Sequence, residues 1–359
     1  MKSNRIEGID LARSLAIIGM IIVNFKMVIG AEGNSWLLSI ANALSGKAAA
    51  LFVTLAGVGI ALMTKKGFVS QDNNLVRSNR IRLIKRSVLL FVIGLSYIVI
   101  WPADILHFYG VYMLVALLFI SSSKRKIFFV ALSIILLYPF MMWMMSYDTG
   151  WNFETLDYKG FWTVDGFIRN LFYNGFHPVF PWVSFMLIGL WYGRHDLHDR
   201  RIVSKLMIRG WLGFVVLLIL SKVLLYVTQS SDPVANEQLS YILGLSPMPP
   251  LPLYMLAGCS LSISVISGCI LMADRFSDSF IIQSLVKTGK LALTLYVAHV
   301  VLGMGLALVY DESMIDKQSI QFTMCYAAVF SMLSIIFSTI WLKYFRSGPL
   351  EWLFKKILG

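Results

Sequence analysis

Residues 9–30 read IDLARSLAIIGMIIVNFKMVIG, an apolar stretch that is interrupted by Asp10, Arg13, Asn24 and Lys26. A helix that crosses a bilayer needs about 20 mostly apolar residues, so this stretch is long enough to cross once. Nine further apolar runs follow along the chain. The ten expected spans are 9–30, 46–63, 84–101, 103–121, 127–145, 178–193, 210–227, 251–272, 288–310 and 320–342.

The composition of the whole chain agrees with this interpretation. Of its 359 residues, 58% are hydrophobic and only 14% are charged, whereas a soluble domain carries about 25% charged residues. This deficit excludes an ordinary soluble enzyme, a disordered regulator and a secreted disulfide scaffold. We therefore predict an all-α, polytopic transmembrane helix bundle over residues 1–342, followed by an amphipathic tail at the inner membrane surface over residues 343–359.

The net charge of +12 is explained by its distribution without a nucleic-acid partner. Residues 228–250 contain no Lys or Arg, and residues 146–177 contain only Lys159 and Arg169. Since Lys and Arg collect in cytoplasmic loops, both termini are expected inside. Five basic residues begin the third expected span and precede it, where they form either an ordinary inner-surface cluster or a phosphate site: Arg77, Arg80, Arg82, Lys85 and Arg86.

Known sequence signatures of catalysis are missing from the chain. We find no P-loop, nucleotide fingerprint, Gly-x-Ser-x-Gly elbow or metal-binding His/Glu helix. The three cysteines lie inside apolar runs, so neither a disulfide framework nor a metal site is expected. Any chemistry must therefore depend on histidines, carboxylates and amides within the membrane.

Polar residues of the first span are the first candidates for a site. Asp10 and Arg13 are three residues apart, so they share a helix face and can neutralise each other near the inner surface. This pair either anchors the helix or binds substrate. Asn24 lies three turns farther along roughly the same face, where it serves as a site or joins helices. Lys47, near a span end, is a substrate-binding candidate that can also snorkel.

Four residues are candidates for catalysis. Asp104 and His107 have the i, i+3 spacing by which a carboxylate orients an imidazole base, although Asp104 could equally cap a helix. His177 precedes a span at its outer end, where either an acceptor or solvent would meet it. His299 falls near the middle of the ninth span, and ionisable residues at that depth mark function by default.

Several segments resemble one family of membrane proteins. They are Arg5–Arg13, Ala16–Asn24, Lys47–Gly59, Asp104–Leu106 with Tyr109 and Gly110, Leu291–Tyr296 and the closing Trp341–Trp352. The chain resembles the YeiB-like (DUF418) family of bacterial membrane proteins. That family is similar to the transmembrane acyltransferases, which include heparan-alpha-glucosaminide N-acetyltransferase and the acyltransferase-3-like enzymes of surface polysaccharides.

The resemblance implies a multi-pass protein of the bacterial cytoplasmic (inner) membrane that uses acyl-CoA, here acetyl-CoA, and no metal. In the polysaccharide enzymes an Arg is followed eleven residues later by a catalytic His, and the matching positions here are Arg13 and Asn24. The lysosomal-type enzymes have Asn there and a catalytic His before a Ser-Trp pair. This chain has Ser35-Trp36 but Gly33 in place of that His. His299 resembles the Tyr-x-x-His of the polysaccharide enzymes.

Three functions remain open at the level of sequence. The first is transfer of an acyl group from cytoplasmic acyl-CoA to a hydroxyl or amine outside, such as that of a cell-surface glycan. The second is a transporter or exporter whose path is lined by the same His and Asp residues, and the third is a scaffold without chemistry. The sequence leaves the acceptor, the acyl chain and a homo-oligomeric state undetermined.

Overall fold

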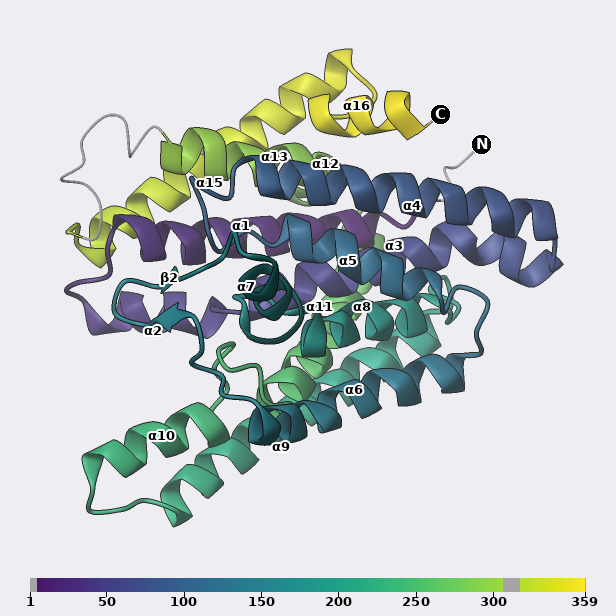
Figure 1. The fold of residues 1–359 in the computed structure, drawn as a ribbon. Helices are drawn as coiled ribbons and strands as arrows, with labels where there is room; N and C mark the ends of the chain where they lie inside the picture. The colour runs from purple at the N-terminus through teal and green to yellow at the C-terminus, as the bar shows by residue number, and fades with distance from the viewer. Residues whose placement is uncertain (1–4, 306–316, 359) are drawn as a thin grey trace. The chain divides into compact units, whose positions relative to one another are not determined.

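The structure is a computed structural model that describes residues 5–305 and 317–358. The described residues are helical except for loops and one short β-hairpin (Figure 1), so the predicted all-α fold class is confirmed. The chain divides into two compact units, residues 1–52, 197–207 and 264–359 in the first, and residues 53–196 and 208–263 in the second. Helices α3 (Lys47–Ser70), α9 (Arg200–Val227) and α11 (Pro252–Arg275) each contribute residues to both units.

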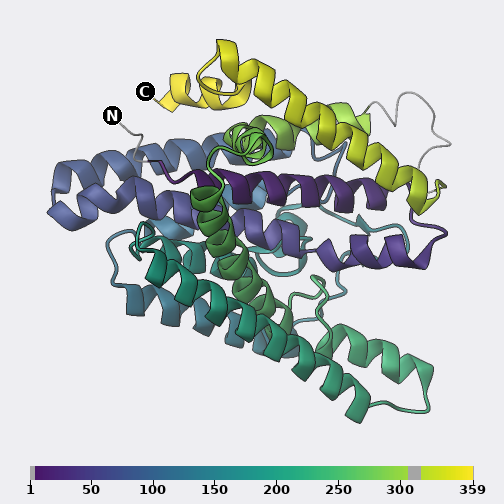
Figure 2. The same cartoon turned by 180° about the vertical axis from the view of Figure 1, so that it is seen from behind.

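The first unit is built around the N-terminal helix. Besides parts of α3, α9 and α11, this unit contains α1 (Glu7–Ile29), α2 (Ser35–Leu44), α12 (Phe280–Lys290), α13 (Ala292–Ala298), the π-helical turn η2 (His299–Met304), α15 (Ile320–Tyr344) and α16 (Pro349–Leu358). Helix α1 packs against α12 and α15, and α16 packs against α13. The yellow helices in Figure 2 are α15 and α16, joined by a short loop. A Cβ atom on Gly289 of α12 would lie 1.7 Å from the Asp10 carbonyl oxygen, so the glycine permits this close crossing.

The second unit contains the remaining elements. They are α4 (Asn73–Ser96), α5 (Leu106–Leu117), α6 (Lys124–Met144), β1 (Trp151–Asn152), β2 (Asp157–Tyr158), α7 (Val164–Arg169), the π-helical turn η1 (Asn170–Asn174), α8 (Val179–Gly193) and α10 (Pro233–Leu243). Helix α5 packs against α4 and α8, and α6 packs against α8. A Cβ atom on Gly94 of α4 would lie 2.4 Å from the His107 backbone nitrogen. This glycine therefore brings α4 against the first turn of α5.

The number of spans differs from the ten expected. Within the described residues, six helices are long and apolar enough to cross a membrane, with α2 and α3 counted together as Ser35–Ser70, or seven if the bent pair α12 and α13–η2 is one span. Helices α5 and α8 are apolar but shorter, and twelve residues of α-helix at 1.5 Å each reach about 18 Å, short of a hydrocarbon core about 30 Å thick. The expected span 84–101 overlaps α4, which ends at Ser96 and starts among basic residues. The chain is nevertheless a multi-pass membrane protein by its apolar helices.

Candidate functional site

The first unit brings together two of the predicted site residues, Asn24 and His299. Asn24 Nδ2 lies 3.0 Å from His299 Nε2, which is hydrogen-bonding distance between residues 275 positions apart. His299 is fully buried, whereas Asn24 is half-buried. A side-chain amide beside an imidazole combines an N–H donor with a group that can hold or release a proton.

Aromatic side chains and an irregular backbone fix the position of the His299 ring. Tyr296 packs against it edge-on at 5.0 Å between centroids, and Phe25 lies 6.3 Å away. Phe52, at the beginning of α3, stacks on Tyr296 at 5.7 Å. His299 is also the first residue of the π-helical turn η2, and such turns are frequent at functional sites. The ring is therefore held in an apolar surrounding at the end of a short helix.

The predicted pair at the start of α1 is present. Arg13 Nη1 donates to Asp10 Oδ1 at 2.8 Å, and Arg5 donates to both Asp10 oxygens at 2.6 and 2.9 Å. Hydrogen bonding to the buried Asp10 carboxylate raises the pKa of Arg5. Lys47 is half-buried at the first position of α3. Two guanidinium groups neutralise Asp10, which agrees with a role of these residues in anchoring the start of α1. A role in binding substrate stays a prediction.

In the second unit, Asp104 and His107 form the expected dyad. Asp104 Oδ2 lies 3.2 Å from His107 Nδ1 and accepts the backbone N–H groups of Leu106 and His107 at 2.8 and 3.2 Å. Tyr97 donates its hydroxyl to Asp104 Oδ1 at 2.7 Å. Both alternatives raised for Asp104 therefore hold at once, since it caps the first turn of α5 and orients the ring. His107 Nε2 is buried and has no hydrogen-bond partner within the described residues.

His177 belongs to the same unit and lies beside this dyad. Its ring packs on Phe108 and, at 4.6 Å between centroids, on Trp182, and its carbonyl accepts the hydroxyl of Tyr112. Burial lowers the pKa of His177 to about 3, with Asp104 raising it and His107 lowering it to smaller extents. His177 is therefore neutral at pH 7. Its ring is packed among aromatics, and contact with an acceptor stays a prediction.

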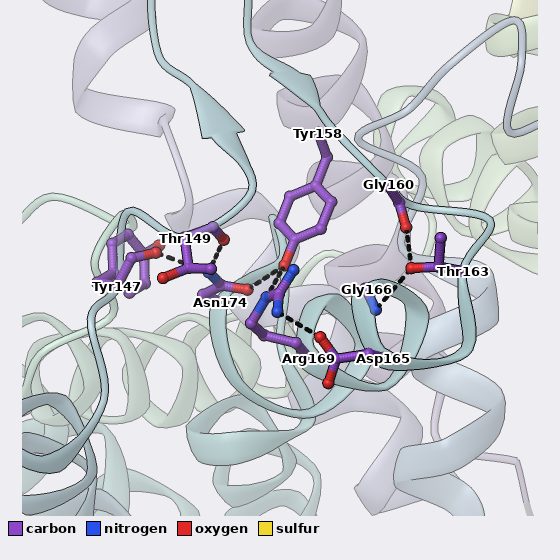
Figure 3. A network of polar contacts seen from close by, with 9 residues as sticks. All are labelled: Tyr147, Thr149, Tyr158, Gly160, Thr163, Asp165, Gly166, Arg169 and Asn174. Carbon is purple, nitrogen blue, oxygen red and sulfur yellow. Dashed lines mark hydrogen bonds and ion pairs between the residues drawn. The ribbon is translucent and has the colours of Figure 1, made fainter.

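The aromatic loop before His177 is organised around one buried amide, as Figure 3 shows. Asn174 Nδ2 donates to the carbonyl oxygens of Tyr147 and Thr149, and its Oδ1 accepts the Tyr158 hydroxyl at 2.8 Å (Figure 3). Arg169 donates to that hydroxyl, and the hydrogen bond raises the pKa of Arg169. These contacts pin the β-hairpin to η1, and η1 leads directly to His177.

The five predicted phosphate-binding residues all lie on α4. Arg77, Arg80, Arg82, Lys85 and Arg86 have exposed side chains along the first part of this helix. Lys65 and Lys66, near the end of α3 in the same unit, are also exposed. The end of α3 and the start of α4 thus carry seven exposed cations, and the turn between them contains the carboxylate of Asp72, which caps α4. The structure places these charges on one hairpin but does not test their role.

Backbone conformation explains why no histidine stands at position 33. Gly33 lies between α1 and α2 with a φ of 109°, and an added Cβ would lie 3.1 Å from the Gln321 side chain. L-residues rarely adopt this φ. The turn is also tied to residues far along the chain, because Gly30 accepts the Thr323 hydroxyl and Gln318 N–H donates to Ile29. A His side chain there would require a different loop.

Sequence analysis did not identify several residues that hold these clusters. Tyr97 and Asn174 carry no motif, and their partners are distant or lie in irregular segments. Tyr296 was noted only through its spacing from His299. Glu351 stood inside the closing motif but was assigned to an amphipathic tail, although its carboxylate bonds to α13. Its position in the most specific matching segment was the available indication.

The fold and these clusters define a membrane protein with histidine–amide and histidine–carboxylate groups inside a helix bundle. The chain belongs to the family described as "Heparan-alpha-glucosaminide N-acetyltransferase, catalytic", whose model matches residues 5–231. Residues 193–358 match "Protein of unknown function (DUF418)". The predicted family resemblance is confirmed. The two matched regions overlap. The first contains Asn24, and the second contains His299.

A relative matches the chain over nearly its whole length. "Uncharacterized protein YxaH" of Bacillus subtilis (strain 168) is 21% identical, and the match covers 99% of this chain and 94% of the relative. This similarity adds no activity, because the relative is itself uncharacterised.

Proposed function

We propose that this protein is a membrane acyltransferase that moves an acetyl group from cytoplasmic acetyl-CoA to a hydroxyl or amine outside, such as that of a cell-surface glycan. The observation that carries the proposal is the Asn24–His299 hydrogen bond in a chain of the N-acetyltransferase catalytic family. Acyl transfer needs a base for the acceptor and a donor for the developing oxyanion. An imidazole and an amide supply these two groups.

The reaction follows from the chemistry of this pair. An acceptor that replaces the amide at His299 Nε2 gives its proton to the ring, and its oxygen or nitrogen bonds to the acyl carbon. Asn24 N–H donates to the carbonyl oxygen while negative charge develops there. The carbon–sulfur bond of the thioester then breaks, and CoA leaves as the thiolate, which takes the proton from the imidazolium. Asp10, Arg13 and Lys47 would bind polar parts of the substrates near the same helix.

Binding of CoA is assigned to the exposed cations of α4. Arg side chains form bidentate hydrogen bonds with phosphate groups, and Arg77, Arg80, Arg82, Lys85 and Arg86 are exposed together. This assignment requires that α4 begins at the cytoplasmic face, in agreement with both termini inside and with location in the bacterial inner membrane. Ten crossings are reached only if the bent pair α12 and α13–η2 is one span and α4, α5 and α8 also cross.

The Asp104–His107 dyad, with His177 beside it, is the second candidate for the base. Asp104 contacts His107 Nδ1, and His107 Nε2 has no hydrogen-bond partner among the described residues, an arrangement like that of enzymes where a carboxylate orients an imidazole. His299 and His107 belong to different units, so replacing each histidine in turn shows which of the two acts as the base. We assign the first role to His299 because an oxyanion donor is hydrogen-bonded to it.

A small-molecule transporter is the alternative, and one observation favours it. Helices α12 and α13–η2 form a pair bent by 74° at a break, and broken helices line binding sites in many transporters. His299 follows α13, the short helix that begins at that break. A transporter should move its substrate across vesicles without CoA, whereas the acyltransferase should consume acetyl-CoA.

The deciding experiment measures acetyl-CoA binding and acetyl transfer by the purified full-length protein, with an unrelated nucleotide as a competitor. We expect saturable, CoA-specific binding and transfer to small glycan or amine acceptors. Asn24→Ala should lower transfer about 100-fold, as expected for loss of one oxyanion donor. Asn42→Ala, which removes an exposed amide bonded to Lys26, is the matched control. Equal activity of the two variants, or no CoA binding by the wild type, would overturn the proposal.

A further inference from the structure

The closing segment Trp341–Trp352 makes a specific contact that the proposed chemistry does not use. Glu351 lies in the first turn of α16, and its Oε1 accepts the backbone N–H groups of Leu293 and Thr294 at 2.8 and 3.1 Å. Glu351 Oε2 accepts the Thr294 hydroxyl, whose oxygen accepts the backbone N–H of Leu350 at 3.1 Å. One carboxylate therefore ties the tail to the start of α13.

The start of α13 needs such a partner. This helix follows the 74° break, and its N-cap residue Leu291 has no side chain that can accept a hydrogen bond. The first backbone N–H groups of a helix lack acceptors within the helix, and a carboxylate there also interacts favourably with the helix dipole. Glu351 supplies the missing acceptor from 58 residues farther along the chain.

The segment around Glu351 is shaped for this contact. An added Cβ on Gly348 would lie 2.2 Å from Glu351 Oε2 and 2.9 Å from Thr294 Oγ1. Phe354, one turn beyond Glu351, is buried, whereas Lys355 and Lys356 are exposed. The tail helix is thus seated by its Glu351 and Phe354 side and leaves its basic side free.

The other end of α13 is the candidate catalytic centre. Helix α13 ends at Ala298, and His299 is the residue that follows it, hydrogen-bonded to Asn24. Only four residues separate Thr294 from His299, so a shift of the capped end moves the imidazole as well. Misplacement of a reacting group by about 1 Å can cost 100-fold in rate.

We propose that Glu351 is a positioning residue, which holds α13 through its N-terminus so that His299 meets Asn24 and the substrate. This inference rests on the proposed function of the Asn24–His299 pair. It gives the closing Gly348–Trp352 motif a role as the brace of a broken helix. Glu351 itself touches no substrate in this scheme.

The test compares Glu351→Ala with Asp278→Ala, a control that removes an exposed carboxylate from the same unit. We expect kcat for acetyl transfer to fall about 100-fold in Glu351→Ala, with KM for acetyl-CoA within twofold of the wild type. Glu351→Gln retains one oxygen acceptor and should recover part of the rate. A kcat of Glu351→Ala within twofold of that of Asp278→Ala would overturn the inference.

Hydrogen exchange measured by mass spectrometry gives a readout that is independent of activity. Amide exchange in the peptide 291–304 should become faster in Glu351→Ala and stay unchanged in Asp278→Ala. Unchanged exchange in Glu351→Ala overturns the positioning role, whereas absence of transfer and CoA binding in the wild type overturns the proposed function. If Glu351→Ala does not fold, Thr294→Val removes the two hydrogen bonds of the hydroxyl, to Glu351 and from Leu350, and leaves the two backbone bonds to Glu351 in place. It must show the same changes to a smaller extent.

Discussion

The two histidine centres of this protein are held by different means. His299 bonds to the amide of Asn24 on a helix 275 residues away in the chain, whereas His107 bonds to a carboxylate only three residues away. Asp104 also accepts two backbone N–H groups and the Tyr97 hydroxyl. The first centre therefore depends on helix packing, and the second is largely fixed by one turn of local structure.

Because their partners differ, the two histidines are also expected to have different chemical roles. The Asn24 amide is neutral, and it offers N–H groups to an oxyanion. The Asp104 carboxylate is already satisfied by four donors, so its loss leaves buried N–H groups without an acceptor. We therefore expect substitutions in the first centre to affect turnover and substitutions at Asp104 to affect folding stability.

The largest effect is expected for His299→Ala, which should lose turnover. Loss of a general base costs about 10²–10⁴-fold in rate, and we expect about a 1,000-fold loss of acetyl transfer by the folded variant, with a lower melting temperature because a buried ring is removed. His107→Ala should retain transfer within tenfold of the wild type. The measurement is initial rate at saturating acetyl-CoA for both variants. The reverse ranking would move the base to the second unit.

The sequence was most informative where the interactions are local. The apolar runs located the long helices, and the spacing of Asp10 and Arg13 and of Asp104 and His107 predicted contacts that the structure contains. Helix lengths were overestimated where an apolar run includes a turn, as at residues 97–105 between α4 and α5. Hydropathy detects apolar residues but does not detect where the backbone leaves the helix.

Long-range partners could not be predicted from spacing. Asn24 and His299 were each singled out as polar residues in apolar runs, yet only packing within the first unit pairs them. Asn174 carries no recognisable signal in the sequence, although three residues of the preceding loop and hairpin bond to its side chain. Glu351 looked like one charge of an amphipathic helix, because the broken helix that it caps cannot be recognised from apolar periodicity.

The second expected effect is a loss of stability in Asp104→Ala. Removal of this carboxylate leaves the N–H groups of Leu106 and His107 buried without their acceptor, at a cost of about 3 kcal/mol. Asp104→Asn keeps one oxygen and should cost about 1 kcal/mol. Thermal unfolding in detergent measures both, with Asp278→Ala as the exposed control. Equal melting temperatures for Asp104→Ala and Asp278→Ala would show that the dyad does not stabilise α5.

The smallest expected effect concerns His177, whose burial lowers its pKa from 6.5 to about 3. Below pH 6.5 the unfolded chain binds a proton that the folded protein does not, so folding stability falls as the pH falls. By pH 5 this group alone should cost about 2 kcal/mol. His177→Gln removes this contribution, and its thermal unfolding should change less between pH 7.5 and pH 5 than that of the wild type. Because Asp104 and the other carboxylates remain in the variant, the difference between the two proteins isolates His177. The same pH dependence in both would mean that this ring takes up its proton while the protein stays folded, and that burial does not keep His177 neutral.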